Sequence, residues 1–229
     1  MRAKAIKAID KKGALLVYPL NNKKEPASIW SELFPRTKMR WEWDAGSDNR
    51  VAELWYLREE LSRSRKVVYV KWYQGRATFF AFDVFVAALA YLRSAQVAAG
   101  LGPDSANILE LLVSDSPLST KQLKAAAELE GRSLESAYNR AMRPLWNHLL
   151  LVGFGEFEDS SFPSLGIGAT QTLFEELWGE AEKLTPGQGE RVLRSRLGDE
   201  NPFMKWLVKV RRTSPVSTTL DKNHSESYI

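Results

Sequence analysis

The stretch that decides the fold is residues 117–159, PLSTKQLKAAAELEGRSLESAYNRAMRPLWNHLLLVGFGEFED. Near its start, Ser119 followed three residues later by Gln122 has the spacing of a capping box. In a capping box each side chain bonds to the backbone N–H of the other residue, which satisfies amides that a new helix leaves unpaired. The spacing therefore predicts a helix over about 120–130, and Gly131 is a natural residue for its end.

A longer helix is expected next, because Ser133 is suited to cap a helix that reaches about residue 149. Its apolar residues recur at three- and four-residue spacing, which predicts a buried face made of Leu134, Ala137, Tyr138, Ala141, Leu145 and Leu149. Residues 149–159 then favour a strand that returns through a hairpin, and SANILELLVSD at 105–115 favours an earlier helix. Three helices followed by a two-stranded ribbon are the order of a winged helix-turn-helix.

The exposed face of that third helix carries groups suited to DNA. A helix of this width fits the major groove, where arginine pairs with guanine edges or phosphate and asparagine with adenine edges. The candidate DNA-binding residues on this face are Arg132, Ser136, Asn139, Arg140 and Arg143, with Ser133 beside them. Such three-helix units also serve as protein-interaction or packing modules, and Glu130 and Glu135 weigh against DNA because phosphate repels carboxylates.

The first 82 residues predict a similar order, with helices near 3–9, 28–34 and 50–62, a strand at 13–20, and a hairpin turn at Gln74-Gly75 between strands 66–73 and 76–82. Ser28 is suited to cap the second helix. On the third helix, Arg58 is expected outside an apolar side that is made of Val51, Leu54, Trp55, Tyr56, Leu57 and Leu61. We therefore expect a mainly α protein with small β-hairpins, of the α+β class, built from tandem winged helix-turn-helix lobes. The expected units are an N-terminal lobe (1–82), a connecting apolar helix and linker (83–103), a winged lobe (104–183), C-terminal helices (184–212) and a disordered tail (213–229). Thr185 and Asn201, each followed by a proline, are suited to cap the two C-terminal helices.

Charge is distributed unevenly along the chain. The net charge is +4, but residues 1–100 hold 18 Lys and Arg against 10 Asp and Glu, whereas residues 101–229 hold 14 against 18. The first part is thus the better candidate to contact a polyanion. Basic and aromatic residues alternate there, and most of the tryptophans are expected in the core. Lys71, Arg76 and Arg40 are the cations that we expect to be exposed and to bind DNA.

Composition excludes several classes of function. The 229 residues include no cysteine and two histidines, which excludes a disulfide framework and makes thiolate or histidine-rich metal sites impossible. No phosphate-binding loop or nucleophile elbow occurs, so no cofactor and no metal are expected. No membrane span or secretory signal is evident, which favours a cytoplasmic protein. His148 is expected at a helix end, and Glu156, Glu158 and Asp159 in a solvated wing tip that phosphate would repel.

A family resemblance rests on particular segments. PLSTKQL (117–123), YNRAMRPLWNHLLLVGFGE (138–156) and the later FEELW resemble the winged-helix unit of the AlkZ/YcaQ alkylpurine DNA glycosylases. The shorter AlkZ-related proteins are similar upstream, at SIWSELFP, WEW, LWYLREEL and VVYVKWYQGRATFF, so the resemblance covers about residues 28–183. It implies a winged-helix fold, a link to DNA repair and duplex DNA as a partner.

The resemblance does not extend to the catalytic residues. The glycosylases carry a Gln-x-Gln or Gln-x-Asp pair, and none of the five glutamines here belongs to one. The favoured hypothesis is a non-catalytic DNA-binding protein of winged-helix type, related to DNA-repair glycosylases, with no catalytic residue assigned. Two alternatives stay open: a glycosylase-like enzyme that acts on damaged bases with a non-standard site, and a protein-interaction module.

Overall fold

A computed structural model describes residues 1–40, 49–92, 100–159 and 163–213 of the chain. Several expectations lie outside the described residues. They are the segment with Trp41 and Trp43, residues 93–99 of the connecting helix and linker, and all but the first residue of the tail that was expected to be disordered.

The N-terminal part of the chain forms short helices and two hairpin strands with an additional edge strand. The elements are α1 (Arg2–Lys12), β1 (Ala14–Leu16), a 3-10 turn (Leu20–Asn22), α2 (Ile29–Leu33), α3 (Asn49–Arg63), β2 (Val68–Tyr73), β3 (Arg76–Phe80) and α4 (Phe82–Leu92). Two local predictions are confirmed. Ser28 caps α2 in a capping box, and Gln74 and Gly75 form the tight turn between β2 and β3 with φ values of 52° and 73°.

The C-terminal part contains the predicted helices and the second hairpin. The elements are α5 (Pro103–Ser114), β4 (Leu118–Ser119), α6 (Thr120–Ala126), α7 (Glu135–Asn147), β5 (Leu151–Phe157), β6 (Ser164–Ala169), α8 (Thr170–Leu173), α9 (Glu175–Glu182), α10 (Pro186–Leu197) and α11 (Pro202–Arg212). The side chains of Ser119, Thr185 and Asn201 cap α6, α10 and α11 as the sequence predicted, each by accepting a backbone N–H.

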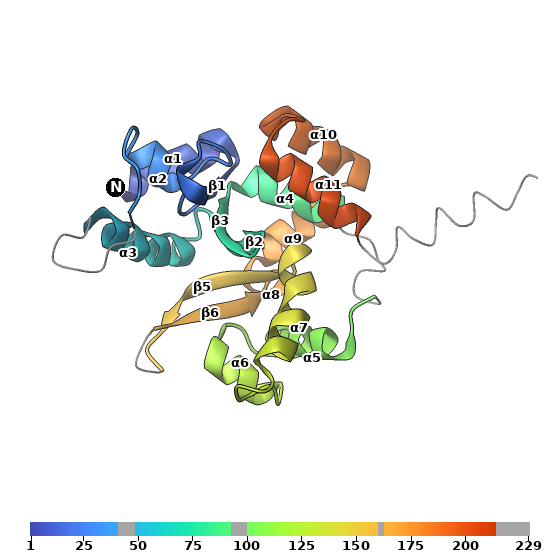
Figure 1. The fold of residues 1–229 in the computed structure, drawn as a ribbon. Helices are drawn as coiled ribbons and strands as arrows, with labels where there is room; N and C mark the ends of the chain where they lie inside the picture. The colour runs from blue at the N-terminus through green and yellow to red at the C-terminus, as the bar shows by residue number, and fades with distance from the viewer. Residues whose placement is uncertain (41–48, 93–99, 160–162, 214–229) are drawn as a thin grey trace, which may run out of the picture.

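The described strands form one antiparallel sheet in the order β1-β3-β2-β5-β6-β4. Figure 1 shows α1, α2 and α3 at one end of this sheet, α5, α6 and α7 at the other, and α10 and α11 packed over α4. The α+β class is therefore confirmed. The expectation of separate hairpins in two lobes is wrong, because β2 pairs with β5 and joins both hairpins in a single sheet.

The apolar helix α4 is enclosed by other helices and does not simply connect two lobes. Every residue from Val84 to Leu92 is buried. Helices α9, α10 and α11 cover it, which explains why its sequence is apolar all round rather than on one stripe. Within the described part of the chain, no helix is long and apolar enough to cross a membrane.

The pairing of β2 with β5 requires a glycine. Tyr69 lies opposite Gly153, and its ring, which is 2% exposed, occupies the space above that residue. A Cβ at Gly153 would come within 2.2 Å of the Tyr69 ring, far inside a normal van der Waals contact. The absence of a side chain at Gly153 on β5 thus leaves room for the Tyr69 ring of β2 at the junction between the two hairpins.

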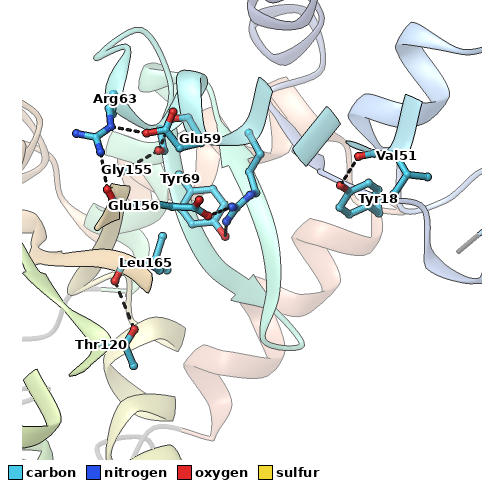
Figure 2. Close-up of polar contacts among 11 residues, drawn as sticks. Tyr18, Val51, Glu59, Arg63, Tyr69, Thr120, Gly155, Glu156 and Leu165 are labelled. Atoms are coloured by element: carbon cyan, nitrogen blue, oxygen red, sulfur yellow. Dashed lines mark hydrogen bonds and ion pairs between the residues drawn. The ribbon is translucent and has the colours of Figure 1, made fainter. Parts of the chain in front are cut away.

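A buried ion pair crosses the same junction. Arg58 on α3 donates a hydrogen bond to Glu156 on β5, and both side chains are almost fully buried. The Arg58 guanidinium also lies 4.1 Å from the ring centroid of Trp55, and the Ser62 hydroxyl accepts the backbone N–H of Gly155 at 2.9 Å. Figure 2 shows Tyr69 and Glu156 at this crossing, together with the contact between Arg63 and the Glu156 backbone.

This ion pair corrects two sequence-based expectations. Arg58 was expected outside the apolar face of its helix, and Glu156 was expected at a solvated wing tip. Each is buried because the other neutralises it; an unpaired charge at that depth would be strongly destabilising. Conversely, Trp55 and Tyr56 were expected on the buried side but are 42% and 73% exposed, with Trp55 covering Arg58 from outside.

We predict that Gly153→Ala lowers the free energy of unfolding by about 1–3 kcal/mol, because the new methyl group overlaps the buried Tyr69 ring. Urea unfolding followed by circular dichroism measures the change. The matched control is Gly179→Ala on α9, where a Cβ meets nothing within 4 Å and alanine favours the helix. The control should unfold at the same or higher urea concentration. Equal stability of the two variants would contradict the role given to Gly153.

Candidate nucleic-acid interface

The third helix of the winged-helix order starts later than the sequence predicted. Helix α7 begins at Glu135, preceded by Leu134, which makes no side-chain capping bond, so Ser133 is not its cap. Gly131, with φ of 90°, redirects the chain at a turn that spans residues 131–134. Arg132 therefore lies in the turn before α7 rather than on its first turn, and Leu134 is 37% exposed rather than part of the buried face.

A cavity of about 690 Å³ lies where α7 faces the β2–β3 turn. Three parts of the chain that are remote in sequence contribute to it: the hairpin of the first half, helices α6 and α7 of the second half, and α11 near the C-terminal end. The lining residues are Lys71, Gln74, Gly75, Thr120, Lys124, Glu135, Tyr138, Asn139, Met142, Arg143, Trp146, Asn147, Ile167 and Trp206.

The lining carries a surplus of positive charge. Lys124 pairs with Glu135 at 2.6 Å and lies 4.9 Å from the ring centroid of Tyr138, so this lysine and this carboxylate largely neutralise each other. Neither Lys71 nor Arg143 forms an ion pair with any residue in the described part of the chain. The cavity thus offers two cations to an anionic ligand, together with the amides of Asn139 and Gln74.

Two charged groups at the cavity have shifted pKa values, and the causes differ. Desolvation, with a further contribution from the nearby positive charge of Arg58, lowers the pKa of the Lys71 ammonium below its ordinary value. An anion placed beside Lys71 would relieve this penalty, so a desolvated ammonium gains more from a phosphate than a fully hydrated one does. The hydrogen bond from Lys124 lowers the pKa of Glu135, which therefore stays ionised at neutral pH.

The structure brings only some of the predicted residues together. Lys71, Asn139 and Arg143 line the cavity. Lys71 was expected to be exposed, but it is half-buried there. Arg76 lines a neighbouring depression of about 530 Å³, which shares Gly75 with the first. The remaining candidates are all exposed and line neither hollow: Arg40, Arg132, Ser136 and Arg140.

Sequence reasoning missed several lining residues. On α7, the cavity side comprises residues 135, 138, 139, 142, 143, 146 and 147, whose spacing of three and four is itself a helical stripe. That spacing could have identified the stripe, but Tyr138 was expected to be core only. No signal in the sequence could have identified Trp206, which reaches the cavity because α11 packs against the end of β2.

His148 ends α7 directly after the cavity-lining Asn147, whose carbonyl oxygen accepts the indole N–H of the buried Trp72 at 3.1 Å. Burial lowers the pKa of the His148 imidazole to about 4, so it is neutral at pH 7 and adds no charge to the interface. This agrees with the expectation of a partly buried helix-end residue.

The wing tip is also more closely packed than expected. The Asp159 carboxylate accepts a hydrogen bond from the buried Ser119 hydroxyl, and its backbone oxygen accepts one from Lys121 at 3.3 Å. The end of β5 is therefore tied to the start of α6. Of the three acids expected to be solvated there, Glu156 and Asp159 are engaged with other side chains, whereas Glu158 is exposed as expected.

These features define an α+β protein in which one antiparallel sheet holds a cationic, aromatic-walled cavity beside the third helix of a helix-rich half. The particular family follows from comparison with known proteins: the family model described as AlkZ related matches residues 2–202, and the chain belongs to this family. The resemblance expected from the sequence is thus confirmed. No curated protein and no solved structure matches the chain.

We predict that acid destabilises the fold through His148. Because its pKa in the folded protein, about 4, is below the ordinary 6.5, the unfolded chain takes up the proton first as the pH falls. The stability that the neutral imidazole preserves is complete above pH 6.5 and is lost progressively towards pH 4, with a total of roughly 3 kcal/mol. Urea unfolding at several pH values measures this loss.

The control for this experiment is His148→Asn, which removes the titrating group and keeps a polar side chain. Its unfolding free energy should fall less between pH 6.5 and pH 4 than that of the wild type, because both share all other titrating groups. Parallel pH profiles for the two proteins would refute the assignment to His148.

Proposed function

We propose that this protein binds duplex DNA through the cavity between α7 and the β2–β3 turn, and that it does so without excising bases. Membership of the AlkZ-related family supports a relation to DNA-repair glycosylases. The observation that carries the proposal is the meeting of Lys71 and Arg143 in one cavity, although 72 positions separate them in the chain. Neither cation has a carboxylate partner among the described residues.

Lys71 and Arg143 lie in one cavity and are suited to bind the phosphate backbone of DNA. Contacts with phosphates contribute most of the affinity of proteins for DNA. Asn139 adds an amide that can read a base edge or bond to a phosphate oxygen. Helix order also supports the proposal: α5, α6 and α7 followed by the β5–β6 hairpin correspond to a winged helix-turn-helix. In that arrangement α7 is the helix that would approach the major groove.

The protein-interaction alternative predicts a different kind of surface. Stable protein interfaces are typically apolar at their centre and depleted in lysine. The described lining combines Lys71, Lys124 and Arg143 with Glu135 and several amides, which favours a polyanion over an apolar partner surface. The tightly packed end of β5 favours contact by α7 and the β2–β3 turn rather than by the second hairpin.

We predict that Arg143→Glu weakens binding to a duplex oligonucleotide by about tenfold or more at low salt. Loss of a phosphate contact should also lower the slope of log affinity against log salt by about 1. Fluorescence anisotropy with a labelled duplex measures both quantities. The matched control is Arg191→Glu on α10, which makes the same charge change at an exposed helical position away from the cavity.

A third variant, Arg140→Glu, distinguishes two modes of DNA contact. Arg140 is exposed on α7 but does not line the cavity. A helix inserted in a groove would use both arginines, so both reversals would weaken binding; contact through the cavity alone would spare Arg140→Glu. No measurable binding by the wild type at low salt would eliminate the DNA-binding proposal and favour the protein-interaction module.

We also predict that the protein does not release methylated purines from alkylated DNA in single-turnover assays. The sequence contains no Gln-x-Gln or Gln-x-Asp pair, and the cavity carboxylate Glu135 is committed to Lys124 with a lowered pKa, which makes it a poor proton acceptor or donor near pH 7. Release that Glu135→Gln abolishes in a folded protein would establish the alternative, a glycosylase-like enzyme with a non-standard site.

A further inference from the structure

Helix α11 is firmly held against the sheet, although it begins where the match to the family ends. Its buried residues Phe203, Met204, Leu207 and Val210 pack into the core. Phe203 contacts the ring of Tyr73 with centroids 5.3 Å apart, and Trp206 contacts the same ring at 5.5 Å. Because Tyr73 ends β2, these rings place α11 beside the turn that forms one wall of the cavity.

Trp206 lies at the border between the buried and exposed sides of α11, and it lines the cavity. The exposed side next to it carries cations at positions i, i+4 and i+7, namely Lys205, Lys209 and Arg212. This spacing places the three on one stripe of the helix. The Lys209 ammonium lies 5.2 Å from the ring centroid of Trp206, so the stripe begins directly at the cavity edge.

A simpler explanation accounts for part of this stripe. Cations near the C-terminal end of a helix are stabilised by its macrodipole, which applies to Lys209 and Arg212. It does not apply to Lys205, which is nearer the positive end of the helix. Among the residues that the structure describes, Lys205 pairs only with Glu200, an acid whose side chain is 93% exposed. A surface pair of this kind contributes little to stability, so Lys205 remains available to another anion.

We propose that α11 is a second wall of the DNA interface: Lys205 and Lys209 contact phosphates of the same duplex whose backbone meets Arg143 and Lys71 at the cavity. This inference rests on the proposed function and extends it beyond the part of the chain that matches the family. Trp206 closes the cavity between the two walls. Arg211, in contrast, faces Tyr91 and Glu190 and has a packing role.

The test is the double variant Lys205→Glu/Lys209→Glu in the full chain, with a fluorescent duplex oligonucleotide as the probe. Binding should weaken by about tenfold or more, and the salt slope should fall by about 2, one for each phosphate contact. The matched control is Lys4→Glu/Lys7→Glu on α1, which changes the net charge equally at exposed helical positions. The control should change affinity by about twofold or less.

Folding of both double variants is checked by thermal unfolding, which exposed substitutions should leave nearly unchanged. If Arg143→Glu weakens binding but the α11 variant behaves as the α1 control does, the α11 wall is refuted and the proposed function stands. If the wild-type protein does not bind the duplex at all, the proposed function itself fails and the α11 wall fails with it.

Discussion

The relative placement of the two hairpins, and with it the cavity, depends on the crossing of β2 and β5. At that point Tyr69 lies over Gly153, and Arg58 is neutralised by Glu156. Both side chains are largely buried, so each charge requires the other. The glycine leaves room for the ring of Tyr69, whose hydroxyl accepts a hydrogen bond from Arg58 at 3.5 Å. Without this pairing, β2 and β5 would each be an edge strand, and the backbone N–H and C=O groups on that side would have no strand partner.

The cavity is a direct consequence of that crossing. Because β2 is fixed beside β5, the turn that follows β2 faces the helix that precedes β5. The indole of Trp72 reinforces this arrangement by donating to the end of α7, and Tyr73 extends it to α11. A rigid scaffold therefore holds three remote segments around one hollow, which is the condition for a preformed binding site.

Charge pairing divides the cations of this hollow into two groups. Lys124 is neutralised by Glu135, whereas Lys71 and Arg143 lack such a partner in the described residues. The partial burial of Lys71 lowers its pKa, and a bound anion would compensate for the lost hydration. In the proposed function, these two cations contact the phosphate backbone of DNA, and that contact requires no excision chemistry.

Much of the local structure was determined by the sequence alone. Capping residues at Ser28, Ser119, Thr185 and Asn201 set four helix starts, because their side chains satisfy nearby backbone amides that no distant residue can reach. The turn at Gln74-Gly75 and the burial of α4 could likewise be predicted from adjacent residues in the sequence. The cap expected at Ser133 failed because the turn after Gly131 continues for three more residues.

Only the tertiary structure decided how the hairpins pair, which charges are buried, and what forms the cavity. Alternating apolar residues show that a strand is half-buried or buried, but they do not specify which strand becomes its neighbour. From the sequence, Glu156 was interpreted as a surface acid, because its partner Arg58 is 98 positions away in the chain. Trp206 joins the cavity for a similar reason: packing of aromatic rings, and not chain proximity, brings α11 to the end of β2. Local sequence patterns determine elements within a few residues, whereas long-range pairing depends on the whole core.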